Sequence, residues 1–322
     1  TIPYFQQNLE TDLSRVNVVI NRAVQSDVAL ISQIGTYIIG AGGKRLRPIL
    51  TILAGKCLGY DSDKLYSLAA MVEFIHTSTL LHDDVVDESE LRRGRKTANH
   101  LFGNASAVLV GDFLYTRAFQ LMVGSGSLKI LEVMAEATNI IAEGEVMQLM
   151  NIGNTEISET EYLQVIQYKT AKLFGAAAQV GAILAGATAE QEQALKDYGA
   201  HIGTAFQIID DVLDYSGSVE QIGKNVGDDL AEGKPTLPLL HAMRHGNPQQ
   251  AALIREAIEQ GGKREAIDEV LAIMAEHKSL DYAMDRAKQE AQKAVDAIQL
   301  LPESEYKNAL ISLAYLSVDR SY

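Results

Sequence analysis

Residues 68–87 read "LAAMVEFIHTSTLLHDDVVD", a run with apolar side chains at helical spacing that ends in three carboxylates, Asp83, Asp84 and Asp87. A second segment, "LKDYGAHIGTAFQIIDDVLD" at residues 195–214, aligns with it without a gap and ends in the same Asp-Asp-x-x-Asp pattern. The distance between the copies is too long for a solenoid repeat, so the repeat favours a helical bundle with two related halves.

The rest of the chain agrees with an all-α fold. It contains only 6 prolines in 322 residues, and its apolar residues follow a period of 3.6 far more often than strict alternation. Turn-like breaks leave helical stretches of about 15 to 25 residues, and none resembles a domain linker. We therefore expect one domain over residues 1–322. The glycine- and alanine-rich segment "LFGAAAQVGAILAGATA" from Leu173 predicts a closely packed helix rather than a membrane span.

Composition excludes several functional classes. The chain has 28 basic and 42 acidic residues, a net charge of −14, which argues against a nucleic-acid-binding protein or one that binds anionic membranes. Cys57 is its single cysteine, and no signal peptide is apparent in the first residues. These features predict a cytoplasmic protein in which any anion is bound at a local basic cluster.

The repeated carboxylates predict a metal site. Residues four apart lie on one face of a helix, so Asp83 pairs with Asp87 and Asp210 with Asp214. Oxygen ligands without cysteine or histidine suit Mg²⁺, which completes its coordination with water and substrate phosphates. A solvated acidic helix end is the alternative, but two copies, each preceded by apolar residues, make it the weaker one.

Two basic clusters predict the matching anion. Lys44 and Arg47 follow the glycines of "GGKRLRP", and Arg92 and Arg93 follow the first carboxylate segment. Glycine amides and arginine forks both suit phosphate oxygens, so carboxylates, metal and basic groups together indicate a diphosphate. His76 lies seven residues, or two helical turns, before Asp83 and shares its face, although a lone histidine on a helix can also be an ordinary core residue.

Five ordered motifs, "GGKRLRP", "HDDVVDESELRRG", "YKTA", "FQIIDDVLD" and "GKNVGDDLAEGKPTLP", resemble those of the trans-prenyl diphosphate synthases over nearly the whole chain. The resemblance implies an isoprenoid-synthase-like helical bundle with a central apolar cavity, a homodimer, and two or three Mg²⁺ ions. It implies condensation of isopentenyl diphosphate with an allylic diphosphate, farnesyl diphosphate being expected, to all-trans octaprenyl diphosphate for a quinone side chain.

The same resemblance assigns roles to single residues. Metal ligands would be Asp83, Asp87 and Asp210, supported by Asp84, Asp211 and Asp214. Isopentenyl diphosphate would be bound by Lys44, Arg47, His76 and Arg93. The allylic diphosphate would be bound by Arg92, Lys169, Lys224 and Lys234. Thr170 and Gln207 would steady the developing cation, and His82, Asp228 and Asp229 would be structural.

Product length is expected to depend on the helix that ends in Asp83. Ser78 and Thr79 are small at positions where short-chain members of the family carry aromatic rings, which would leave a route for a long tail. Met122 and Met134 are candidates for its far end, although methionine is also ordinary core filler.

Three alternatives remain open. A synthase with a shorter or otherwise different product is the nearest. A class I terpene cyclase carries one such aspartate motif but does not need a second diphosphate site, which "GGKRLRP" and "RRG" indicate. A non-catalytic regulatory subunit would be free to lose motifs that are intact in this chain.

Overall fold

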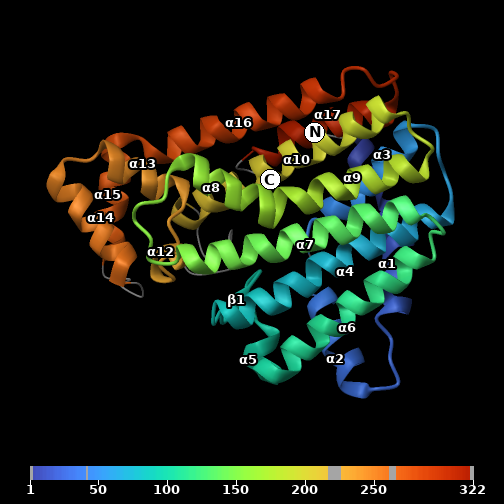
Figure 1. Cartoon of the computed structure of the whole chain (residues 1–322), viewed down its shortest axis with the longest axis horizontal. Helices are drawn as coiled ribbons and strands as arrows, with labels where there is room; N and C mark the ends of the chain where they lie inside the picture. The colour runs from blue at the N-terminus through green and yellow to red at the C-terminus, as the bar shows by residue number, and fades with distance from the viewer. Residues whose placement is uncertain (1–2, 41–42, 217–225, 261–265, 320–322) are drawn as a thin grey trace.

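The computed structural model describes residues 3–40, 43–216, 226–260 and 266–319 (Figure 1). The elements in chain order are α1 (Pro3–Ala23), α2 (Ala29–Gly40), α3 (Leu46–Cys57), α4 (Asp63–Val86), β1 (Leu91–Arg92), β2 (Arg95–Lys96), α5 (Ala98–Phe102), α6 (Asn104–Val123), α7 (Leu128–Asn151), α8 (Glu159–Ile166), the π-helix η1 (Gln167–Ala171), α9 (Lys172–Leu184), α10 (Ala189–Ser216), α12 (Asp228–Ala231), α13 (Leu237–His245), α14 (Pro248–Gln260), α15 (Ile267–His277), α16 (Ser279–Ala297) and α17 (Glu305–Ser317).

The predicted all-α bundle is confirmed over the described residues. Figure 1 shows α4, α6, α7, α9 and α10 running side by side, and contacts join α4 to α6, α9 to α10 and α3 to α9. The shorter helices α13, α14 and α15 gather at one end. β1 and β2 form a short antiparallel hairpin, with two residues in each strand, beside the end of α4. No described helix has the length and apolar content needed to cross a membrane.

Several helices begin where the sequence offers a capping side chain. The Ser62 hydroxyl accepts a hydrogen bond from the Lys64 N–H at the start of α4. Ser158 and Glu161 form a reciprocal capping box at the start of α8. These side chains satisfy amide groups that have no partner inside the helix, so they fix where α4 and α8 begin.

Among the described residues, the core forms two buried clusters joined by α10. One fills the space between α3, α4, α6, α7 and α9, and the other lies under α8 and α13 to α16. α10 contributes side chains to both clusters, for example Tyr198 to the first and Ile208 to the second. This long helix therefore carries the second aspartate motif between the two packed regions.

The prediction that residues from Leu173 form a closely packed helix is also confirmed. A Cβ atom at Gly181 of α9 would lie 2.3 Å from the Thr51 carbonyl oxygen of α3. The Thr51 hydroxyl donates a hydrogen bond to the Ala177 carbonyl at 2.8 Å. Only glycine permits this approach of the two backbones, which keeps the start of α3 beside the aspartate helices.

Candidate active site

A single cleft of about 1010 Å³ brings the predicted motifs together. Its walls are the start of α3, the C-terminal ends of α4 and α7, residues of α8, η1 and α10, and the segments 88–93 and 228–236. The two aspartate motifs thus face one cavity, as the repeat predicted. Apolar side chains, including Leu80, Val165 and Phe206, line part of the same cleft.

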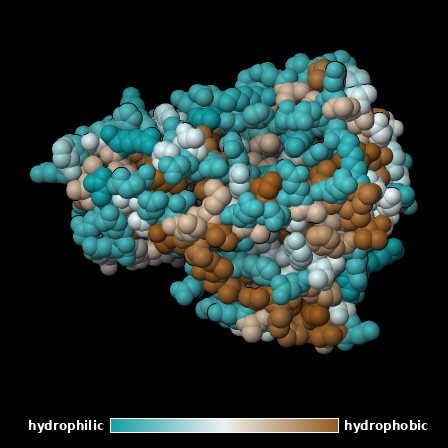
Figure 2. Space-filling model, in the orientation of Figure 1, coloured by the Kyte–Doolittle hydropathy of each residue, from teal (hydrophilic) through white to brown (hydrophobic). Residues whose placement is uncertain are grey.

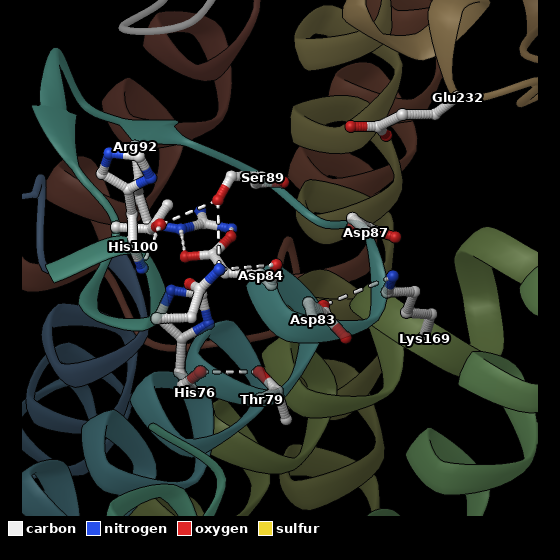
Figure 3. A network of polar contacts seen from close by, with 12 residues as sticks. His76, Thr79, Asp83, Asp84, Asp87, Ser89, Arg92, His100, Lys169 and Glu232 are labelled. Carbon is white, nitrogen blue, oxygen red and sulfur yellow. Dashed lines mark hydrogen bonds and ion pairs between the residues drawn. The ribbon is translucent and has the colours of Figure 1, made fainter. Parts of the chain in front are cut away.

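Asp83 and Asp87 of the first motif both line the cleft, and each is paired with a lysine from another element. Asp83 Oδ2 lies 3.4 Å from Lys169 Nζ of η1, as Figure 3 shows, and Asp87 Oδ2 lies 3.0 Å from Lys234 Nζ. Burial lowers the pKa of Lys234, but the neighbouring carboxylates, Asp87 first, raise it above its ordinary value overall. Two ammonium groups therefore neutralise carboxylates that are expected to bind metal.

Asp84, between them, has a different role. Its side chain is buried, and its oxygens accept hydrogen bonds from Arg92 Nε at 2.8 Å and Nη2 at 2.6 Å (Figure 3). The Asn99 side chain donates to the backbone carbonyls of Asp84 and Ser89. This bidentate ion pair fixes the position of the segment that follows α4. Arg92 also lines the cleft, where its guanidinium is already bound to the Asp84 carboxylate.

The second motif divides in a similar way. Asp210 is exposed in the cleft, whereas Asp211 is buried. The expectation that Asp214 would share the face of Asp210 is wrong, because Asp214 is fully buried and its Oδ2 accepts a hydrogen bond from the Asp229 N–H at 3.1 Å. The helix is enclosed on that side by the segment that carries α12, so the carboxylate four residues on faces the protein interior.

The two basic clusters meet at one side of the cleft. A Cβ atom at Gly43 would lie 2.8 Å from Arg93 Cζ, so the segment before α3 contacts the hairpin turn. Arg93 and Gly94, the residues of that turn, both have positive φ values, 52° and 76°. This geometry is typical of tight hairpins, but it is disfavoured for arginine, and such strain is concentrated at functional sites.

Arg47 is half-buried in this region. Its Nη1 lies 3.3 Å from His76 Nε2, and its guanidinium carbon lies 4.3 Å from the centre of the Phe174 ring. Its Nε is buried without a hydrogen-bond partner among the described residues. Burial, together with Arg93, lowers the pKa of Arg47 to about 10.

The imidazole beside Arg47 responds to the same surroundings. Burial and the nearby arginines hold the pKa of His76 well below its ordinary value, so it is neutral at pH 7. Positive charge gathered beside a buried donor without a partner is the environment that an anion would stabilise.

Lys169 and Thr170 enter the cleft from η1, a single π-helical turn between α8 and α9. A Cβ atom at Gly144 of α7 would lie 2.7 Å from the Lys169 backbone nitrogen, so α7 crosses this turn in close contact. Widened turns of this kind are frequent at functional sites. Lys44 and Gln207 also line the cleft, whereas Lys224 lies outside the described residues.

Residues of α7 and α8 line the cleft although the sequence did not single them out. Glu145 and Gln148 of α7 are three residues apart, and Gln148 accepts a hydrogen bond from Lys169 Nζ. Burial and the nearby Asp83 raise the pKa of Glu145 to about 8. The spacing in "EGEVMQLM" allows one shared face, but only the rotation of α7 in the bundle shows that this face meets the aspartates.

Tyr162 of α8 is the other missed residue. It is buried, and its hydroxyl donates a hydrogen bond to Asp211 Oδ2. Burial and Asp211 raise the pKa of Tyr162 well above its ordinary value, so the hydroxyl remains protonated near neutral pH.

The four residues predicted to control product length occupy different environments. Thr79 lines the cleft, but Ser78 is buried and donates a hydrogen bond to the Gly111 carbonyl of α6 at 2.8 Å. Ser78 therefore faces the contact between α4 and α6. Met122 and Met134 are fully buried in the first core cluster, and neither lines the cleft. Their control of product length stays a prediction.

The arrangement fits divalent metal ions bound together with an anionic substrate. Carboxylate oxygens face the cleft from the aspartate motifs of α4 and α10, and Oε1 of Glu145 is buried beside them without a hydrogen-bond partner among the described residues. Within that part of the chain, no three carboxylate, histidine or cysteine groups converge tightly enough to hold one ion by themselves. Ligands split between two walls suit Mg²⁺, which takes one or two carboxylates and completes its shell from phosphate and water.

Comparisons with known proteins agree with this geometry. A family model described as polyprenyl synthetase matches residues 28–274. The octaprenyl diphosphate synthase of Haemophilus influenzae is 66% identical over 322 residues, covering 100% of this chain and 98% of that protein. The octaprenyl diphosphate synthase of Escherichia coli is 58% identical over 309 residues, or 96% of each chain.

A solved structure gives the same result for the fold. A polyprenyl synthase from Caulobacter crescentus, crystallised with calcium and isoprenyl diphosphate, has a TM-score of 0.95 and 45% identity, and the match covers 99% of this chain and 97% of that one.

Proposed function

Because the chain belongs to the polyprenyl synthetase family, we propose that it condenses isopentenyl diphosphate with an allylic diphosphate to form all-trans octaprenyl diphosphate. The observation that carries this proposal is a cleft in which carboxylates of α4 and α10 face two basic clusters. Its similarity to two octaprenyl diphosphate synthases supports the product length. We further propose that farnesyl diphosphate is the allylic primer and that the product supplies a quinone side chain.

Asp83, Asp87 and Asp210 would hold two or three Mg²⁺ ions on the allylic diphosphate. Bound Mg²⁺ would act as a Lewis acid that stabilises the negative charge of the departing diphosphate. Lys169 and Lys234 lie beside these carboxylates, so their ammonium groups would also bind oxygen atoms of the allylic diphosphate. Arg92 lines the same cleft and would contribute to this binding. Lys224 is assigned here by resemblance alone.

Lys44, Arg47, His76 and Arg93 would hold isopentenyl diphosphate on the other side. Arg47 offers a buried donor, and neutral His76 can hydrogen-bond without adding charge. The isopentenyl double bond would then attack the allylic cation, which Thr170 and Gln207 steady with their oxygen atoms. The departing diphosphate is the base we assign to the proton lost from the new chain, and the apolar lining excludes water from the cation.

We also propose that the enzyme is a homodimer. Several exposed apolar side chains lie on α6 and α7. Figure 2 shows hydrophobic surface where Figure 1, in the same orientation, places α4, α6 and α7. The residues concerned are Leu109, Val123, Leu128, Val146, Leu149 and Met150. A surface of this kind is typical of subunit contacts. The lone, buried, free Cys57 supports a cytoplasmic location.

One experiment tests the proposed function against its alternatives. The purified chain is incubated alone with Mg²⁺, isopentenyl diphosphate and farnesyl diphosphate, and the products are dephosphorylated and separated by chromatography. An eight-unit alcohol supports the proposal. A shorter ladder identifies another synthase, a cyclic hydrocarbon identifies a terpene cyclase, and no product from a folded chain identifies a non-catalytic subunit.

Replacing Arg93 by lysine is expected to raise the KM for isopentenyl diphosphate by about 10-fold and to change the allylic KM much less. Lysine keeps the charge but cannot form the bidentate fork, a loss of about 1.4 kcal/mol in binding. Initial rates with each substrate varied in turn measure the two constants. Arg255→Lys, on the exposed side of α14, is the control. Equal changes in both constants would contradict the assignment of Arg93 to one substrate.

Thr79→Phe is expected to shorten the main product to about four prenyl units or fewer. A helical turn advances ~5.4 Å, about the reach of one prenyl unit, so an aromatic ring on the cleft wall would block the tail within a turn or two of the metals. Thr79→Ser should retain the long product.

Ser78→Phe tests the other route. A ring at this position enters the contact between α4 and α6. Shortening in this variant alone would show that the tail runs along that contact and not past Thr79.

A further inference from the structure

A chain of four hydrogen-bonded side chains runs along the wall of the cleft from Tyr162 of α8 to Thr170 of η1. The Tyr162 hydroxyl donates to Asp211 Oδ2, and Gln207 Nε2 donates to Asp211 Oδ1 at 3.0 Å. At the other end, Thr170 Oγ1 donates to Gln207 Oε1 at 3.2 Å. The chain therefore joins α8, α10 and η1, and it ends on the two groups assigned to the developing cation.

The hydrogen bonds of this chain show the orientation of the Gln207 amide. Its NH₂ group donates to Asp211 Oδ1 and its oxygen accepts from Thr170 Oγ1, so the NH₂ group is turned toward Asp211 and the oxygen toward Thr170. The same NH₂ group lies 3.5 Å from Asp210 Oδ2, which favours the same orientation. Gln207 and Thr170 both line the cleft, so the amide oxygen is held at the cleft wall beside the Thr170 hydroxyl.

An amide that turns over would present its positive end instead. The oxygen and nitrogen of a glutamine side chain are nearly equal in size, so packing alone does not distinguish the two orientations. Asp211 makes the distinction only while its own carboxylate is held in place. The buried Tyr162 hydroxyl holds the oxygen of Asp211 that Gln207 does not use.

We propose that Tyr162 is a positioning residue for prenyl transfer, which acts through Asp211 to keep the oxygen of the Gln207 amide directed at the reacting allylic group. This inference rests on the proposed function. Tyr162 itself does not touch the substrate in this scheme. Its contribution is to the stabilisation of the cation, so its loss affects the chemical step more than the binding of either diphosphate.

Tyr162→Phe removes only the hydroxyl. We expect kcat to fall about 10-fold, within the range for groups that orient a residue at the reaction centre, while both KM values stay within about 2-fold. Tyr198→Phe is the matched control, because Tyr198 is also buried and its hydroxyl donates to the Leu310 carbonyl at 2.6 Å, away from the cleft. Both variants should lose similar stability in urea unfolding, but Tyr198→Phe should keep the wild-type kcat.

A double variant separates positioning from a general structural role. If Tyr162 acts through Gln207, then adding Tyr162→Phe to Gln207→Ala should change kcat by less than about 2-fold, because residues that act as a unit are not additive. Multiplication of the two effects would overturn the proposal, and so would a full kcat in Tyr162→Phe.

Asp211→Asn supplies a variant that does not depend on the folding of Tyr162→Phe. The new side chain can accept from Tyr162 with its oxygen, and its NH₂ group then faces Gln207 and requires the amide to turn over. We expect kcat to fall at least as much as in Tyr162→Phe. Wild-type kcat in Asp211→Asn would also overturn the proposal. An inactive wild-type chain would instead contradict the proposed function, so the two failures are distinct.

Discussion

Asp83→Ala and Asp210→Ala are each expected to lower turnover by ~10³-fold while leaving a folded helical protein. Each variant removes a carboxylate from one wall of the cleft, so the charge on the departing diphosphate loses a stabilisation of several kcal/mol, and each 1.36 kcal/mol corresponds to a factor of ten in rate. Steady-state rates with saturating Mg²⁺ measure the loss, and circular dichroism checks the fold.

Two further measurements make this prediction specific. Isothermal titration with Mg²⁺ and inorganic diphosphate should show weaker binding in both variants, and Asp285→Ala, an exposed carboxylate of α16, should resemble the wild type in rate and binding. In Asp83→Ala, the pKa of Glu145 should also fall from about 8, because Asp83 raises it. Near-normal turnover in either variant would refute the assigned metal site.

Lys234→Met is expected to reduce both stability and activity. Lys234 Nζ lies 3.0 Å from Asp87 Oδ2 and 2.8 Å from Glu232 Oε2, and its side chain is only 12% exposed. Removing one partner of a buried ion pair costs about 3–5 kcal/mol, because the remaining carboxylates are left without a counter-charge. Turnover should fall by ~10²-fold, since a donor to the diphosphate is also lost.

Metal should restore part of the lost stability, because a cation on Asp87 replaces the missing charge. Urea unfolding with and without Mg²⁺ plus diphosphate measures this recovery. Lys307→Met is the matched control, because Lys307 is also buried and its Nζ is held by Glu303 Oε1 and by the carbonyls of Gln299 and Leu301, far along the chain from the cleft. Lys307→Met should also lose stability, but its kinetic constants should equal those of the wild type, and adding metal should not restore its stability. Equal recovery in both would refute the explanation.

Sequence reasoning predicted the fold and the meeting of the motifs because both depend on repeated local patterns. Helical spacing and the duplicated aspartate motif placed two carboxylate helices in one bundle, and α4 and α10 occupy those places. Spacing along a helix could not specify which side of α10 would be enclosed, so Asp214 was expected to share the face of Asp210 and does not.

The side chains around the aspartates were harder to predict because they depend on contacts between distant segments. Glu145 and Tyr162 reach the site through the rotation of α7 and α8, and nothing in their own segments specifies that rotation. Likewise, Asp84 and Asp211 occupy equivalent positions in the two motifs, yet one holds an arginine and the other a glutamine and a tyrosine. In both copies of the motif the middle aspartate is buried, but the motif does not specify which side chains form hydrogen bonds with it.

The π-helical turn at Gln167–Ala171 also bears on which changes in chain length this region can accept. A π turn contains one residue more than an α turn, and each residue of an α-helix advances the side-chain direction by about 100°. Deleting one residue here would restore an ordinary α turn, and because either turn closes a full circle, α9 would keep its face toward α3 and Gly181 would still meet Thr51. The directions of the residues within the turn, Lys169 and Thr170, would change instead. A one-residue deletion elsewhere in α8 or α9 has no widened turn to absorb it and would rotate the rest of the helix by about 100°.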